Sequence, residues 1–271
     1  MKAAFKITLT KALSGTFIAL ATLLIPTYSA AQINLEYNVP ASSLSQAISG
    51  NGVQILNPQL VCADSSSGTY SITGIPDFPE GEGIILTTGN IRNLLGPNNT
   101  EASTTINGTP GDPLITTITG NSSFDACILE FDVVPVGDTL RFNFTFASEE
   151  YDEYVGTPFN DFFGFFISGP GIIGDPGLDG LENIAVLPGT NTSVGVNTIN
   201  NGNTDLGVPA SNPELYIGNA LGLTAPVQYD AWTIGLSAVK QVTPCDTFSI
   251  QLFIADVADP ELDSAGLIQA I

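Results

Sequence analysis

Hydrophobic and polar positions alternate in short segments along most of this chain. Phe142, Phe144 and Phe146, for example, alternate with Asn143 and Thr145, which is the period-two pattern of a strand with one buried face. Glycine and proline recur between such segments, at 28 and 18 residues, and they leave stretches too short for most helices. The pattern therefore predicts an all-β protein.

Short apolar or alternating segments bounded by turn residues mark the strands that we expect. Within residues 161–168, positions 162, 163 and 165–167 are apolar and fall on both faces, as in a central strand that is covered on both sides. Many short strands with regular turns favour a β-sandwich with jelly-roll-like connections. The expected strands are residues 84–88, 128–134, 139–146, 161–168, 184–187, 231–238 and 247–257.

One short N-terminal helix is expected within residues 39–53, and it is the only helix that the pattern predicts. Leu44, Ala47 and Ile48 would form its apolar stripe, and Ser42 or Ser43 would cap its first turn. Residues 90–123 and 189–225 are rich in Asn, Thr, Gly and Pro and are expected as long loops.

The N-terminus has the pattern of a signal peptide. Lys2, Lys6 and Lys11 accompany an apolar run over residues 13–25, and small residues follow at positions 29–31. The run is shorter than the roughly 20 residues that span a bilayer. We therefore expect residues 1–31 to be removed after Ala31, leaving residues 32–271 as one exported domain without membrane insertion.

Charge narrows the classes of partner. The chain carries 27 acidic and 6 basic residues, a formal net charge of −21. After removal of the predicted signal only Arg92, Arg141 and Lys240 remain against all 27 acids, so the formal charge becomes −24. Such a surface repels phosphate backbones and attracts divalent cations, which excludes nucleic acid as an expected partner.

Residue usage also limits the chemistry. The chain has no histidine, which excludes hydrolase triads built on histidine and histidine-based zinc sites. No glycine-rich phosphate loop of standard spacing occurs. Cys62, Cys127 and Cys245 allow one disulfide, which export makes chemically reasonable, with three pairings open.

Oxygen-bearing side chains concentrate between the strands expected at 139–146 and 161–168, and again near the end of the chain. Neither group has a neighbouring Lys or Arg in sequence. Hard cations such as Ca²⁺ prefer carboxylate and amide oxygens, although the spacing is not that of an EF-hand. The candidate Ca²⁺ ligands are Glu149, Glu150, Asp152, Glu153, Asn160, Asp161, Asp256, Asp259 and Asp263.

Other interpretations of these residues stay open. The acids could be solvated charges in a loop and in a turn around Pro260, or a pair among residues 149–153 could hydrolyse a glycosidic bond. Tyr229 and Trp232 could offer a saccharide platform. Trp232 and Leu236 are expected to share one strand face, however, which favours core packing.

Five segments together have a recognisable combination of motifs. They are FDACILEFDVVP, FASEEYDEYVGTPFNDFFGFFISGPG, LPGTNTSVGVNTIN, QYDAWTIGLSA and PCDTFSIQLFIADVADPELDS. These segments resemble the bacterial choice-of-anchor L domain, and the similarity runs from about Tyr37 to Ile271. That family implies a secreted or surface-displayed all-β module joined to varied C-terminal anchors, and it implies no molecular activity. No recognisable anchor follows, so a fragment or a released form is expected.

Together these observations predict an exported, non-catalytic module of the adhesion type at the cell surface. Its expected partner is an extracellular protein or a glycan, and Ca²⁺ is the candidate stabilising ion. The runner-up is a calcium-dependent, lectin-like carbohydrate-binding module. A glycosidase with a carboxylate pair is the least favoured function, and no catalytic residue is assigned.

Overall fold

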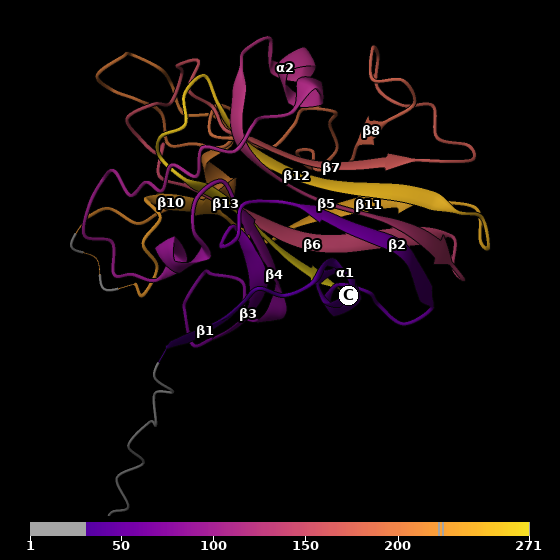
Figure 1. Ribbon diagram of the computed structural model, residues 1–271. Coiled ribbons are helices and arrows are strands. Elements are labelled where there is room, and N and C mark those ends of the chain that lie inside the picture. Colours follow the sequence, from indigo (N-terminus) through magenta and orange to yellow (C-terminus); the bar gives the residue numbers. More distant parts are fainter. Residues whose placement is uncertain (1–30, 222, 224, 271) are drawn as a thin grey trace, which may run out of the picture.

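The computed structural model describes residues 31–221, 223 and 225–270, in which two curled antiparallel sheets face each other (Figure 1). The larger sheet has eight strands in the order β1-β3-β4-β13-β6-β10-β9, with β11 also paired to β6. The smaller has five strands in the order β2-β5-β12-β7-β8. The strands are β1 (Gln32–Tyr37), β2 (Val53–Val61), β3 (Ser67–Thr73), β4 (Gly81–Thr87), β5 (Ser123–Pro135), β6 (Thr139–Ser148), β7 (Phe162–Ser168), β8 (Glu182–Asn183), β9 (Tyr216–Gly218), β10 (Ala231–Thr233), β11 (Leu236–Gln241), β12 (Phe248–Val257) and β13 (Ser264–Ala270).

The main core lies between the sheets and is built on the alternating phenylalanines of β6. Phe142 packs against Phe165 of β7 with ring centroids 4.7 Å apart, and Phe144 packs against Phe163 at 5.2 Å. Burial of each such side chain stabilises the fold by roughly 1.5–3 kcal/mol. The period-two pattern therefore identified the strand that carries much of this core.

Two further apolar clusters cover the outer faces of the sheets. On the larger sheet, Trp232 packs edge-on against Phe78 at 5.0 Å, and its indole Nε1 donates to the Asp77 carbonyl. On the smaller sheet, Phe162 and Phe166 of β7 pack with Ile115. β7 is therefore covered on both faces, as its sequence predicted.

Residues 231–238 form two strands rather than one. Trp232 pairs with Ala147 of β6, whereas Leu236 pairs with Phe144. Four steps along this segment correspond to three along β6, so the extra residue reverses the side-chain alternation. Trp232 thus faces the outer cluster and Leu236 the main core, and the prediction that they share a face was wrong.

Other strand predictions need smaller corrections. The strand expected at residues 184–187 is instead the two-residue β8 just before it, and Val186 forms only an isolated bridge with Ser193. Besides β8, five further strands, β1, β2, β3, β9 and β13, lie outside the strands that we expected. Two antiparallel sheets are present, and the jelly-roll-like connection stays a prediction.

The predicted helix is α1 (Ala41–Ala47), which begins after Pro40 without a side-chain cap from Ser42 or Ser43. Leu44 and Ile48 are buried as expected, whereas Ala47 is exposed.

A second helix, α2 (Pro113–Thr119), lies within the segment expected as a loop, so the prediction of a single helix was wrong. Asp112 caps it and Gly120 ends it in the left-handed region, with φ 74°. Two short 3₁₀ helices, η1 (Ile91–Leu94) and η2 (Pro213–Leu215), lie in the two predicted loops.

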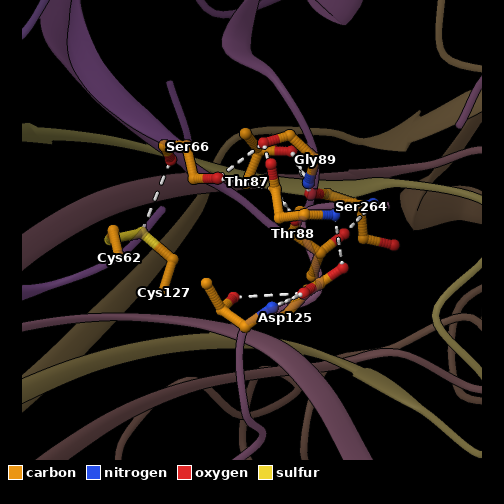
Figure 2. Close-up of a disulfide and its surroundings, with 10 residues drawn as sticks. Cys62, Ser66, Thr87, Thr88, Gly89, Asp125, Cys127 and Ser264 are labelled. Carbon is orange, nitrogen blue, oxygen red and sulfur yellow. Dashed lines mark hydrogen bonds between the residues drawn. A yellow bond between two sulfur atoms is a disulfide. The ribbon is translucent and has the colours of Figure 1, made fainter. Parts of the chain in front are cut away.

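One of the three possible disulfides forms. Cys62 is bonded to Cys127, which ties the end of β2 to β5, while Cys245 is free and exposed. Figure 2 shows that the disulfide lies beside Ser66 and near Asp125. Residues 1–30 of the predicted signal peptide lie outside the described residues. Among the residues that the structure describes, no helix is long and apolar enough to cross a membrane.

Candidate functional site

Strand register places three acids side by side at one end of the larger sheet. Ser148, the last residue of β6, pairs with Ala231 of β10 on one side and with Ser264 of β13 on the other. The residues one step beyond these pairs are Glu149, Asp230 and Asp263. Three neighbouring strands thus each contribute a carboxylate to the same edge.

The smaller sheet contributes acids in the same way. Ala255 of β12 pairs with Phe162 of β7, so Asp256 follows opposite Asp161. Asp125 lies where the register between β5 and β12 shifts. With Glu150, which lies next to Glu149 in the chain, seven carboxylates gather where the ends of the two sheets meet. We call these residues the carboxylate cluster: Asp125, Glu149, Glu150, Asp161, Asp230, Asp256 and Asp263.

The carboxylate cluster is buried and contains no basic side chain. Its members are between 0 and 7% exposed. Lys240 pairs with Glu182, the guanidinium of Arg92 lies 4.8 Å from the ring centroid of Tyr37, and Arg141 is exposed. In the described part of the chain Lys240–Glu182 is the only ion pair. Buried carboxylates without a partner cation are costly, so each must be hydrogen-bonded, protonated or bound to a cation.

Two members of the cluster are well satisfied by a loop. The Asp125 carboxylate accepts hydrogen bonds from the backbone N–H of Asn107 and from the N–H and hydroxyl of Thr109. The Asp263 carboxylate accepts from the N–H of Thr105 and from the side-chain amide of Asn93. These two acids therefore hold the loop at residues 105–109 against the sheets.

Other members keep oxygens without a hydrogen-bond partner among the described residues. The unpartnered atoms include Glu149 Oε1, Asp161 Oδ2, Asp230 Oδ2 and Asp256 Oδ1. The second oxygen of Asp161 accepts from the backbone N–H of Val257 at 3.1 Å. Glu149, Asp161 and Asp230 are each held through their other oxygen. All four carboxylates leave one oxygen available for a ligand.

The electrostatics of the cluster favour the neutral acids as long as no cation is bound. Burial, together with the charge of Asp230, raises the pKa of Glu149 from 4.5 to about 9. Burial raises the pKa of Glu150 to about 8. The pKa values of Asp161 and Asp256 also lie well above the ordinary value, first because of burial and then because of neighbouring carboxylates. A bound cation would reverse this preference.

Five of the nine predicted Ca²⁺ ligands belong to the cluster: Glu149, Glu150, Asp161, Asp256 and Asp263. The interpretation of these five as solvated loop charges was wrong, because all are buried.

The other four predicted ligands lie outside the cluster. Asp152 accepts from the hydroxyl of Tyr216, Asn160 Oδ1 accepts from the N–H of Asn197, and Asp259 accepts from its own turn. Glu153 is exposed.

Sequence reasoning missed two members, Asp125 and Asp230. Asp230 directly precedes β10, just as Asp161 directly precedes β7, so an acid at the first position before a strand was a usable signal. In the described part of the chain, no three Asp, Glu or Cys side chains are placed to hold a metal ion by themselves. An ion at the cluster must therefore also use neutral oxygens.

These features define an all-β module of two antiparallel sheets with a buried acidic end. The model of the choice-of-anchor L domain family matches residues 32–271, and the chain therefore belongs to this family, as the sequence resemblance predicted. Membership indicates a surface-anchoring module of a cell-surface or exported protein. Comparisons with curated proteins and with solved structures give no match.

Proposed function

We propose that this chain is a non-catalytic, adhesion-type module that is displayed outside the cell and binds an extracellular protein or glycan. Family membership supports the location. The main observation in favour of a non-catalytic role is that Glu149 and Glu150 are buried, with 0 and 1% of their surface exposed. Neither residue lines any of five cavities of about 290–400 Å³ among the described residues, whereas a glycosidase needs two carboxyls that reach the substrate.

Location is tested on intact cells of the native host. If the module is displayed, protease added outside the cells should remove it while a cytoplasmic marker stays intact. A module that is degraded only after the cells are broken would contradict the proposal.

Activity is tested separately with purified residues 32–271. The protein is expected to leave a panel of polysaccharides and aryl glycosides intact, because Glu149 and Glu150 are buried. Turnover that disappears in Glu149→Gln or Glu150→Gln would instead identify a carboxylate-pair glycosidase.

A calcium-dependent lectin is the second candidate, because a polar cavity adjoins the carboxylate cluster. This cavity of about 350 Å³ lies between α2, residues 157–162 and residues 192–198, and Asp161 reaches it from the cluster. Amides and hydroxyls such as those of Asn121, Asn160 and Thr198 line it, and these groups hydrogen-bond readily to sugar hydroxyls.

A glycan array with and without calcium separates the two candidates. Selective binding that requires calcium and is lost on narrowing the cavity with Thr198→Leu would favour the lectin. The aromatic platform is not part of this candidate, because Tyr229 and Trp232 are buried in the outer cluster of the larger sheet, and their core interpretation is confirmed.

A further inference from the structure

We propose that Asp161 and Asp256 hold one hard divalent cation, Ca²⁺ by its chemistry, between the ends of β7 and β12. This site concerns how the module is stabilised, so it goes beyond the proposed function and does not depend on it. The register of the smaller sheet places the two residues opposite each other. Each is about 1% exposed and keeps one oxygen without a partner, Asp161 Oδ2 and Asp256 Oδ1.

Neutral oxygens complete the surroundings of this pair. Ser264 Oγ, like the free oxygens of the pair, is buried without a hydrogen-bond partner among the described residues. The hydroxyls of Ser264 and Thr88 lie near Asp161 and Asp256 respectively. Thr88 and Ser264 are held together, because the backbone N–H of Ser264 donates to Thr88 Oγ1 at 3.0 Å (Figure 2). Two carboxylates with two hydroxyls make a mixed oxygen set, which agrees with the absence of three converging acids among the described residues.

The remaining acids add to the attraction for a cation. Glu150 lies close enough to both Asp161 and Asp256 for their charges to interact, and Asp125 and Asp263 act on Asp256 in the same way. The backbone N–H of Asp161 donates to Glu150 Oε2 at 3.1 Å, which fixes this third carboxylate beside the pair. In the described part of the chain no basic side chain offsets these charges.

Ligand chemistry selects calcium over the common alternatives. All the available donors are oxygens, whereas zinc sites in proteins are built mainly on Cys sulfur and His nitrogen. Magnesium loses its water reluctantly and usually keeps several water molecules, which a buried pair of strand ends accommodates poorly. Calcium accepts six to eight oxygens in irregular arrangements. The cavity that adjoins Asp161 and Val257 gives the ion a route from solvent.

The experiment compares thermal unfolding of purified residues 32–271, stripped with EDTA, in EDTA, in about 10 mM CaCl₂ and in about 10 mM MgCl₂. With the affinity typical of extracellular calcium modules, a Kd of roughly 10⁻⁴ M, calcium should raise Tm by roughly 5–10 °C, and magnesium by less. Titration calorimetry should give one strong site. Identical melting curves in EDTA and calcium would overturn the proposal.

Two variants with matched chemistry assign the site. Asp256→Asn keeps the side-chain shape but cannot become a carboxylate ligand, so it should lose the calcium-dependent rise. It should melt in EDTA no lower than the unmodified protein, because a neutral amide replaces an acid that burial disfavours in its charged form. Asp259→Asn, three residues further along and half-buried, should keep the full rise. A full rise in Asp256→Asn, or its loss in Asp259→Asn, would overturn the assignment.

A third variant covers the case in which Asp256→Asn does not fold. Ser264→Ala removes only a hydroxyl, and it is expected to weaken calcium binding in calorimetry while the Tm in EDTA changes little. If Asp256→Asn does not fold and Ser264→Ala binds calcium with unchanged affinity, neither Asp256 nor Ser264 is supported as a ligand. That result would overturn the proposal. None of these outcomes depends on where the protein is displayed, so the site and the surface function can fail separately.

Discussion

Replacing Gly89 by alanine is expected to lower the free energy of unfolding by about 3 kcal/mol or more, since a Cβ here would overpack a buried site that cannot relax. An ideal Cβ at position 89 would lie 1.7 Å from Asp263 Oδ2 and 2.1 Å from its Cγ. The Asp263 carboxylate cannot easily move away, because the N–H of Thr105 and the amide of Asn93 hold it in place. Urea unfolding of residues 32–271 at neutral pH measures the effect.

The matched control is Gly137→Ala, in the turn between β5 and β6, where an added Cβ meets no atom within 4 Å. Its free energy of unfolding should differ from that of the unmodified protein by no more than an ordinary surface substitution causes, about 0.5 kcal/mol. Equal midpoints for the two variants would mean that the Asp263 carboxylate does not lie against Gly89. The close packing of Gly89 against Asp263 also holds the end of β4 against the start of β13.

The strands that build the main core were predictable because their side chains repeat over several residues. β6 and β7 carry phenylalanine at almost every inward position, and no other local structure buries that pattern as well. β1 carries the same period-two pattern in QINLEY but is a short edge strand directly after the predicted cleavage site, where the signal was overlooked, and β9 has only three residues. α2 carried usable signals in Asp112, Pro113 and Gly120, but its short length and its threonines concealed them.

The acidic loop could be predicted as a site from the sequence, but the residues that make up the carboxylate cluster could not. Glu149 and Glu150 are buried, whereas Asp152 and Glu153, only a few positions later, are exposed. The difference arises because Glu149 directly follows a residue paired on both sides, while Asp152 lies beyond the reach of β10 and β13. Asp230 and Asp256 are brought to the same place only by the register of the strands, and this register cannot be read from a single sequence.

The second large effect is expected from pH. In EDTA, the stability of residues 32–271 should fall as the pH rises from about 5 to 9, opposite to ordinary acid denaturation. The folded protein raises the pKa of Asp263 to about 6, of Asp230 to about 7, of Glu150 to about 8 and of Glu149 to about 9, in each case mainly through burial. The unfolded chain releases these protons at lower pH, so the stabilisation is complete below the unfolded pKa values and is lost as the pH rises through the folded ones.

Each proton that the folded state retains should contribute a slope of about −1.4 kcal/mol per pH unit to the free energy of unfolding. Urea midpoints measured in EDTA at intervals of one pH unit give this slope. Glu149→Gln, which keeps the shape and cannot ionise, should be more stable than the unmodified protein at pH 8 and should show a shallower slope. Asp205→Asn, at an exposed turn, should leave the slope unchanged.

Saturating calcium should flatten the profile, because the cation replaces protons as the partner of the buried carboxylates and favours their charged forms. A profile in EDTA that rises with pH, as in proteins whose carboxylates are ion-paired, would show that the cluster is solvated or neutralised in some other way. A falling profile that calcium leaves unchanged would mean that the buried acids are stabilised by protons alone. The pH profile in EDTA thus tests whether the carboxylate cluster is buried, because the raised pKa values depend on burial. The effect of calcium on that profile tests separately whether a cation binds between Asp161 and Asp256.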